Sequence, residues 1–132
     1  MILTVLLIFN CSALLAPAVN SVAIFRTEGI SHYTNLIHAV GTVESNCDTL
    51  AYNPLEEATG YFQVRPIRLL DYNRRTGKHY KLSDMYDYDK AKKVFLYYAS
   101  QFDYRDIKGI CRSWNGKSKH NHYFEKVKRY LN

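Results

Sequence analysis

The sequence predicts a mainly helical protein, with a single compact domain of about five short helices that follows an apolar N-terminal leader. The chain has 132 residues, which is enough for one compact domain and too short for two of ordinary size. Apolar residues recur three and four positions apart in several segments, as they do on one face of an amphipathic helix. Strand-like alternation is weak throughout, and no repeat or low-complexity stretch divides the chain.

The leader has the composition of an export signal. The first 24 residues contain no Asp, Glu, Lys or Arg, and residues 2–9 form an apolar run. Small residues favour cleavage after Ala18 or Ala23, so we expect a signal peptide over residues 1–23 and a mature domain over residues 24–132. The protein would then be secreted or periplasmic, or tethered to the membrane if the signal stays uncleaved. After cleavage we expect no stable membrane span.

The first helix of the domain is predicted over residues 32–45. Its apolar side chains follow helical spacing, and a polar cluster over residues 46–48 ends it. The apolar stripe consists of Leu36, Ile37, Val40 and Val43.

A polar loop through Asn53 and Pro54 is predicted next. Residues 57–73 are predicted to be helical around Pro66, in a segment that closes at Gly77. A small hairpin could form in residues 72–82.

Three further helices are predicted over residues 89–102, 106–114 and 122–131. The first has an acidic start, with lysines on one side and apolar residues on the other. The second is stopped by Asn115 and Gly116. The inward-facing residues of the last helix are Phe124, Val127 and Leu131.

The charge of the chain predicts an acidic partner. The chain contains 18 Lys and Arg residues and 12 Asp and Glu residues, which gives a formal net charge of +6. Such a protein is attracted to polyanions, of which nucleic acid and the bacterial cell wall are two. The 12 tyrosines could stack on nucleic-acid bases, but the export signal favours the wall, and we expect no nucleic acid partner. A basic surface that only aids solubility is the simpler alternative. We expect a monomer.

The cysteines leave two arrangements open. Loss of the leader removes Cys11 and leaves Cys47 and Cys111, which could form a disulfide in an oxidising compartment or stay as two buried thiols. Neither cysteine has ligand-type neighbours at metal spacing, and the histidines fit surface positions. We therefore predict no metal and no cofactor.

Glu44 is the residue that the helical pattern singles out. Ile37, Val40 and Glu44 stand at i, i+3 and i+7, which places a carboxyl group on the apolar face. Burial and the negative end of the helix dipole both raise the pKa of such a group. A carboxylic acid that stays protonated near neutrality can act as a general acid on a glycosidic oxygen. A glutamate whose stem packs while its head reaches water is the alternative, and the pattern alone favours it.

Three stretches, in order along the chain, resemble the catalytic domain of soluble lytic transglycosylases, a lysozyme-like family that includes relatives of goose-type lysozyme. Residues 39–45, AVGTVES, are similar to the family's apolar helix that ends in the catalytic Glu followed by Ser. Residues 60–66, GYFQVRP, fit the family's Gly-x-x-Gln-x-x-Pro. Residues 114–116, WNG, resemble the Tyr-Asn-x-Gly segment that lines the sugar groove. The resemblance extends over residues 36–131.

The resemblance implies a lysozyme-like α+β fold, with helices around a sugar-binding groove, and Glu44 as the catalytic acid and then base. It implies that Ser45 and Gln63 hold the substrate's N-acetyl groups and the Glu44 carboxylate. It also implies that Asn115 supports the groove. Tyr98, on the helix between the second and third motifs, is a further candidate for binding substrate.

The chain departs from the family pattern within two of the motifs. Tyr61 and Phe62 replace the usual aliphatic residue and Met. Trp114 stands where Tyr is usual, so we expect this substrate-binding side chain to stack on a sugar face without a hydroxyl contact. Gly116 follows Asn115 directly, whereas many members have a small residue between the two.

The reaction depends on whether a second carboxylate is present. Hydrolysis by the usual scheme needs one within roughly 5 to 10 Å of the first. The resemblance instead implies a lytic transglycosylase, which cleaves the MurNAc–GlcNAc bond of peptidoglycan and leaves 1,6-anhydro ends. Lysozyme-type hydrolysis and a catalytically idle peptidoglycan-binding module are the alternatives. The nearest acids in sequence, each more simply a loop, helix-start or surface residue, are Asp48, Glu56, Glu57 and Asp71.

Overall fold

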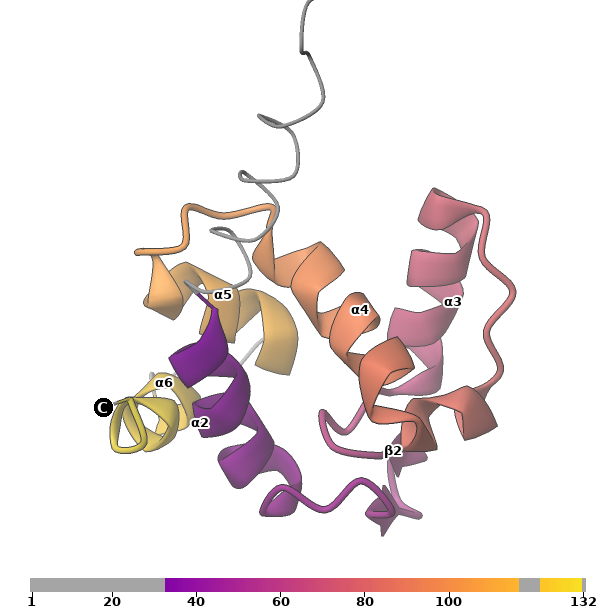
Figure 1. Ribbon diagram of the computed structural model, residues 1–132, viewed down its shortest axis with the longest axis horizontal. Coiled ribbons are helices and arrows are strands. Elements are labelled where there is room, and N and C mark those ends of the chain that lie inside the picture. Colours follow the sequence, from indigo (N-terminus) through magenta and orange to yellow (C-terminus); the bar gives the residue numbers. More distant parts are fainter. Residues whose placement is uncertain (1–32, 117–121, 132) are drawn as a thin grey trace, which may run out of the picture.

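The computed structural model describes residues 33–116 and 122–131, so the predicted signal peptide and its cleavage sites lie outside the described residues. The described part is mainly helical and carries one small antiparallel sheet (Figure 1). None of its helices is both long and apolar enough to cross a membrane. The elements are α2 (Thr34–Ser45), β1 (Tyr52–Asn53), β2 (Ala58–Thr59), α3 (Pro66–Thr76), the 3-10 helix η1 (Leu82–Tyr86), α4 (Tyr88–Ala99), α5 (Ile107–Asn115) and α6 (His122–Lys128).

The predicted helices α2, α4, α5 and α6 are confirmed, with shifts of a few residues at their ends. Helix α2 ends at Ser45 because Asn46 adopts a left-handed conformation with φ of 56°. The side chain of Asp87 accepts a hydrogen bond from the backbone N–H of Lys90 and so begins α4. Asp106 caps α5 in the same way. Local capping chemistry therefore sets three of these boundaries.

The prediction of a helical segment over residues 57–73 is wrong in its first part. Ala58 and Thr59 form β2, and α3 begins only at Pro66, whose missing N–H would have no partner in a first helical turn. Helix α3 then ends at Gly77, which has a φ of 68°.

The hairpin expected in residues 72–82 is also wrong. This stretch contains the end of α3, a loop and the start of η1. The antiparallel pair forms instead between β1, where a polar loop was predicted, and β2, which falls in the segment predicted to be helical. Strands of two residues are too short to show an alternating pattern, so the sequence gives no signal for them.

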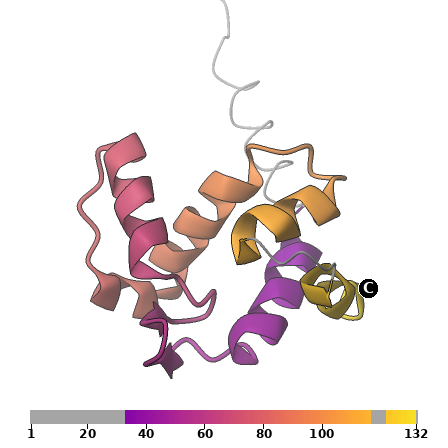
Figure 2. The ribbon, with the colours of Figure 1, turned by 180° about the vertical axis from the view of Figure 1, so that it is seen from behind.

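Helix α4 lies in the middle of the domain, with α3 on one side and α5 on the other (Figures 1 and 2). Its residue Phe95 is fully buried and stacks on Phe62, with 4.8 Å between ring centroids and 6° between planes. Trp114 of α5 meets Phe95 edge-on at 5.1 Å. These three rings join the second and third sequence motifs through the core.

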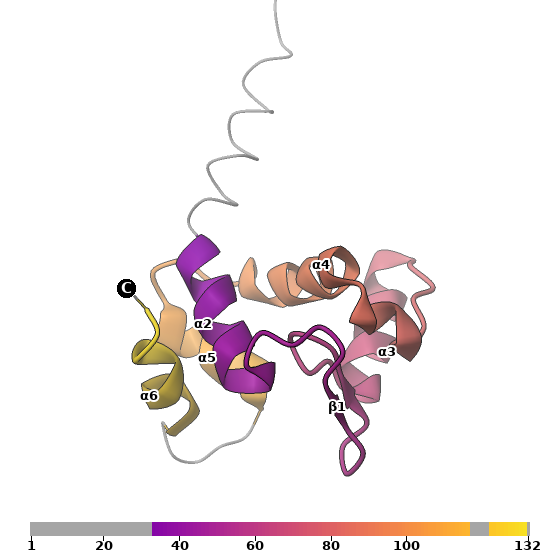
Figure 3. The same ribbon diagram turned by 60° about the horizontal axis from the view of Figure 1, so that its bottom comes forward.

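The second motif packs closely on α2. A Cβ added at Gly41 would overlap the ring of Tyr61, so this approach requires glycine. The hydroxyl of Ser45 donates to the carbonyl of Tyr61 at 2.9 Å and fastens the loop to the end of α2. Gly60 has a φ of 76°, and a Cβ there would meet the carbonyl oxygen of Met85. The hairpin next to this loop projects between α2 and α3 (Figure 3).

Candidate functional site

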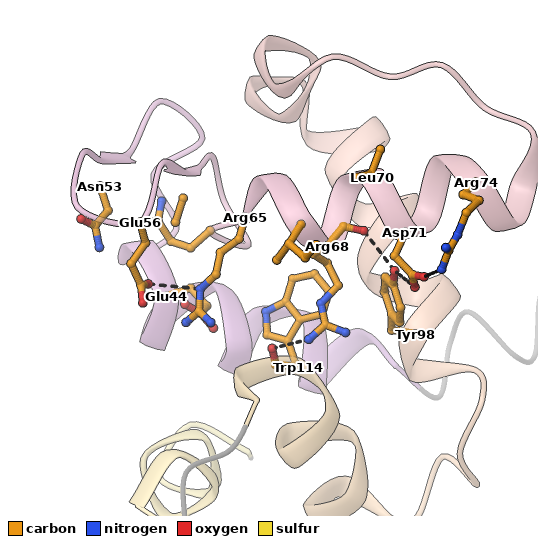
Figure 4. A pocket seen from close by; sticks show the side chains of 13 residues that line it. Glu44, Asn53, Glu56, Arg65, Arg68, Leu70, Asp71, Arg74, Tyr98 and Trp114 are labelled. Carbon is orange, nitrogen blue, oxygen red and sulfur yellow. Dashed lines mark hydrogen bonds and ion pairs between the residues drawn. The ribbon is translucent and has the colours of Figure 1, made fainter.

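A cavity of about 620 Å³ contains most of the residues that the sequence singled out. Its volume is in the range of ligand-binding sites. Of the predicted site residues, Glu44, Gln63, Tyr98 and Trp114 line it, whereas Ser45 and Asn115 do not. The other lining residues, several of them drawn in Figure 4, are Asn53, Glu56, Ala58, Arg65, Ile67, Arg68, Leu70, Asp71 and Arg74.

Glu44 lies in the last turn of α2, and its side chain is half-buried at one end of the cavity (Figure 4). Burial raises the pKa of its carboxyl group to about 7. The hydroxyl of Tyr123 and the charge of Arg65 act in the opposite direction but do not cancel the effect of burial. The Glu44 carboxyl group therefore keeps a proton in part of the molecules at neutral pH, as a general acid requires.

The hydrogen bond to this carboxyl group comes from the C-terminal helix. The hydroxyl of Tyr123 in α6 donates to Oε1 of Glu44 at 2.6 Å. Burial and the nearby carboxyl group both raise the pKa of Tyr123, so it stays an uncharged donor. An uncharged donor fixes the direction of the carboxyl group without adding a cation that would hold it ionised.

Gln63 does not donate to the Glu44 carboxyl group, and this part of the prediction is corrected. The Nε2 atom of Gln63 donates to the carbonyls of Gly60 at 3.1 Å and Ala51 at 3.3 Å, which uses both of its hydrogens. These bonds support Gln63 in a left-handed conformation, with φ of 48°, which costs a non-glycine residue about 1 to 2 kcal/mol. Gln63 thus shapes the cavity wall while its amide oxygen can still accept.

Ser45 and Asn115 have supporting positions. The hydroxyl of Ser45 contacts the backbone carbonyls of Tyr61 at 2.9 Å and Gly41 at 3.3 Å. Asn115 is the last residue of α5 and follows Trp114, which reaches the cavity. The hydroxyl of Ser45 therefore makes its contacts within the fold, and the predicted role of Ser45 in binding substrate stays a prediction.

Trp114 and Tyr98 border the cavity although both are largely buried. The Nε1 atom of Trp114 donates to the carbonyl of Phe62 at 3.3 Å, which fixes the indole plane. The hydroxyl of Tyr98 lies 2.9 Å from Oδ2 of Asp71 and 3.0 Å from the carbonyl of Arg68. The polar atoms of both rings are thus occupied within the protein, and only ring surface is left for a ligand.

Tyr61 and Phe62, which differ from the family pattern, pack within the core. Both side chains are buried, and neither lines the cavity. Tyr61 packs edge-on against Phe62 at 4.7 Å and against Tyr88 at 5.0 Å. The larger side chains in this motif therefore fill space behind the cavity wall.

Two acids that looked like surface residues in the sequence line the same cavity as Glu44. Glu56 sits in the hairpin and forms an ion pair with Nε of Arg65 at 3.1 Å. Asp71 in α3 binds Arg74 at 3.0 Å and Arg75 at 2.8 Å. Each of the two carboxylates is neutralised by arginine, which distinguishes them from Glu44.

Tyr123 is a site residue that the sequence analysis did not predict. Tyr123 and Val127 stand four residues apart in α6 and so share a face. Val127 is fully buried, which confirms its predicted inward position. That spacing was the only available signal for Tyr123, because its partner lies 79 residues earlier in the chain.

Cys47 and Cys111 are free thiols in the structure, so the expected alternative of a disulfide is not realised. Burial raises the pKa of Cys111 to about 12, which leaves it an unreactive thiol. The sulfur of Cys47 lies 3.4 Å from the hydroxyls of Thr42 and Tyr61 and is part of the contact between α2 and the second motif.

The histidines that the structure describes lie on the surface. His38, His79 and His122 are exposed, and His32 and His120 lie outside the described residues. Within residues 33–116 and 122–131, no group of three or more His, Cys, Asp or Glu side chains is placed to hold a metal ion.

Comparison with known proteins gives no assignment: no family model, no curated protein and no solved structure matches the chain. Functional inference therefore depends on the geometry of the cavity and on the sequence motifs.

Proposed function

We propose that this chain is a peptidoglycan lytic transglycosylase with a lysozyme-like fold, which cleaves the MurNAc–GlcNAc bond and leaves 1,6-anhydro ends. The observation that carries the proposal is the half-buried carboxyl group of Glu44, whose pKa is raised to about 7 in a cavity bordered by Gln63 and Trp114. A partly protonated carboxyl group in a cavity of this size can supply the proton that glycosidic bond cleavage needs.

The proposed reaction uses Glu44 twice. In the first step its carboxylic acid protonates the glycosidic oxygen, and the oxygen of the substrate's own N-acetyl group bonds to C1 as the bond to the leaving sugar breaks. In the second step the Glu44 carboxylate takes the proton of the C6 hydroxyl as that oxygen bonds to C1 and displaces the acetyl oxygen, which closes the 1,6-anhydro ring. The hydroxyl of Tyr123, 2.6 Å from Oε1, stabilises the ionised form between the two steps.

Two features of the whole chain support a location of this reaction at the cell wall. The formal net charge of +6 attracts the protein to a wall that is rich in carboxylates and phosphates. The N-terminal 24 residues, free of acidic and basic side chains, favour export to the secreted or periplasmic side.

Hydrolysis in the manner of a lysozyme is the second candidate, and the position of Glu56 favours it. Glu56 lines the same cavity as Glu44, and a second carboxylate could activate a water molecule. Its ion pair with Arg65 occupies Oε2. We prefer the transglycosylase reaction because this arginine competes with water for the carboxylate.

Digestion of purified sacculi, followed by mass analysis of the released muropeptides, tests the proposal. Anhydro ends are the expected product. Reducing ends would establish hydrolysis instead, and undigested wall would overturn both reactions. The variant E44Q should release nothing, whereas E125Q, which changes an exposed glutamate on α6 outside the cavity, should digest the wall like the unsubstituted protein.

A further inference from the structure

We propose that Arg68 is a specificity-determining residue that pairs with a carboxylate carried on the glycan strand, so that the cavity favours acidic wall glycan over an uncharged N-acetylglucosamine polymer. This inference rests on the proposed function and names the chemical feature of the substrate that the cavity reads. The feature is a carboxylate attached to a sugar, either on the lactyl group itself or on a peptide joined to it.

Two of the three arginines that line the cavity are paired with a carboxylate. Arg65 pairs with Glu56, and Arg74 pairs with Asp71. Across the two described stretches of the chain, Arg68 forms no ion pair with a carboxylate. Arg68 therefore contributes a positive charge to the cavity that no neighbouring acid balances.

The guanidinium group of Arg68 is fixed in place before any ligand binds. Its Nη2 atom donates to the carbonyls of Ser113 at 2.6 Å and Trp114 at 2.9 Å, at the negative end of helix α5. Its Cζ lies 4.5 Å from the centre of the Tyr98 ring and 5.3 Å from that of Trp114. A cation held this way loses little conformational entropy when it binds an anion.

Enough of the guanidinium group is left over to bind a carboxylate. The two backbone carbonyls use the two hydrogens of Nη2, which leaves the hydrogens of Nε and Nη1 as separate single donors on two edges of the guanidinium plane. The Arg68 side chain is only half-buried and lines the middle of the cavity, between Glu44 at one end and Asp71 at the other (Figure 4).

The wall beside Arg68 suits a group that is both acidic and apolar. Ile67 and Leu70 of the same helix line the cavity and are 72% and 65% exposed. A lactyl group or an alanine-containing peptide presents a methyl group next to its carboxylate or amide. Such a group can place the methyl on Ile67 or Leu70 and the carboxylate on Arg68.

Binding measured by calorimetry tests this inference in the full-length E44Q background, in which no glycan is cut. The ligands are wall glycan oligosaccharides stripped of peptide, which carry free lactyl carboxylates, the same oligosaccharides as methyl esters, peptide-bearing oligosaccharides, and chitin oligosaccharides of equal length. We expect the free carboxylate form to bind roughly tenfold or more tightly than its methyl ester or chitin. Equal affinity for all four ligands would overturn the role of Arg68.

The peptide-bearing ligand identifies which carboxylate is read. Tighter binding of peptide-bearing glycan than of the stripped acid form assigns the peptide carboxylate, and the reverse order assigns the lactyl carboxylate. Both results support the inference. Failure of all four ligands to bind would instead overturn the proposed function itself.

Substitution of Arg68 separates recognition from support of the fold. We expect R68Q to weaken binding of the acid form roughly tenfold and to leave chitin binding nearly unchanged. R112Q, which changes an exposed arginine on α5 outside the cavity, is the matched control and should alter neither. An equal loss of both ligands in R68Q would show that Arg68 only supports the cavity wall. If R68Q does not fold, the comparison of free acid and methyl ester on the unsubstituted arginine still decides the question.

Discussion

Two carboxyl groups at opposite ends of the cavity each have a tyrosine hydroxyl as a neighbour and yet differ widely in acidity. Glu44 receives a hydrogen bond from Tyr123, and burial raises its pKa to about 7. Asp71 lies 2.9 Å from the hydroxyl of Tyr98, and its pKa falls to about 2. A tyrosine hydroxyl therefore lies beside a carboxyl group whose pKa is raised and also beside one whose pKa is lowered.

The difference between the two groups comes from their cations and from water. The hydrogen bond from Arg75 is the largest influence on Asp71, and Arg74 adds a second guanidinium group. Loss of solvent is the largest influence on Glu44, and no arginine or lysine within the described chain forms an ion pair with it. The protein thus holds one carboxyl group as a proton donor and the other as a permanent anion.

The largest expected effect is on wall cleavage. E44Q removes the proton donor and should lower the rate by a factor on the order of 10² to 10⁴. D71N removes an anion that is already neutralised by arginine and should lower the rate only a few-fold. Muropeptide release at neutral pH measures both. Equal losses in the two variants would contradict the assignment of the acid to Glu44.

The two tyrosines should differ in their effect on the pH profile of kcat/KM. Y123F removes a hydrogen bond that lowers the pKa of Glu44, so the falling limb of the profile should move to higher pH. The loss of orientation should also lower kcat roughly 10- to 100-fold. Y98F should leave the falling limb in place, because Tyr98 contacts Asp71, and the hydrogen bond from Arg75 still keeps the pKa of Asp71 low. A limb that does not move in Y123F would show that Tyr123 has no influence on the titrating group.

Glu44 should also make the stability of the protein fall with pH. Its pKa is about 4.5 in the unfolded chain and about 7 in the folded protein, so the unfolded state binds fewer protons between these values. The free energy of unfolding therefore decreases as pH rises through this window, by about 3 kcal/mol. E44Q has no carboxyl group at this position, so its free energy of unfolding should not decrease in this way. In urea denaturation, the free energy of unfolding of E44Q relative to that of the unsubstituted protein should increase between about pH 4 and pH 8 and then stay constant. A pH-independent difference would count against the raised pKa.

Asp71 should show the smallest effect, and with the opposite sign. Its pKa is lower in the folded state, so its contribution to stability is present above its ordinary value of 3.8 and is lost as pH falls toward about 2. D71N should lower the melting temperature modestly at neutral pH and not at about pH 2, because these ion pairs are largely exposed. Thermal denaturation at the two pH values measures this.

The sequence predicts Glu44 better than it predicts Tyr123 and Arg68. The spacing of Ile37, Val40 and Glu44 is local to one helix, and local spacing survives folding unchanged. Tyr123 and Arg68 could not be predicted in the same way, because their roles depend on residues 79 and 45 positions away in the chain.

The errors in the fold have a similar cause. The hairpin strands contain two residues each, and their pairing depends on a turn and not on a periodic pattern. The direction of the Gln63 amide depends on a left-handed backbone that a glutamine rarely adopts. Helix ends marked by Asn46, Asp87 and Asp106 were predicted within a few residues, since capping is local.

The central claim is that Glu44 keeps its proton near neutrality, and titration of its side-chain carboxyl carbon by ¹³C nuclear magnetic resonance tests it most directly. The spectrum of E44Q identifies the signal, which disappears in that variant. We expect this signal to titrate with a midpoint near 7. A midpoint near 4.5 would contradict the account, because the carboxyl group would then be ionised at the pH at which it must donate a proton.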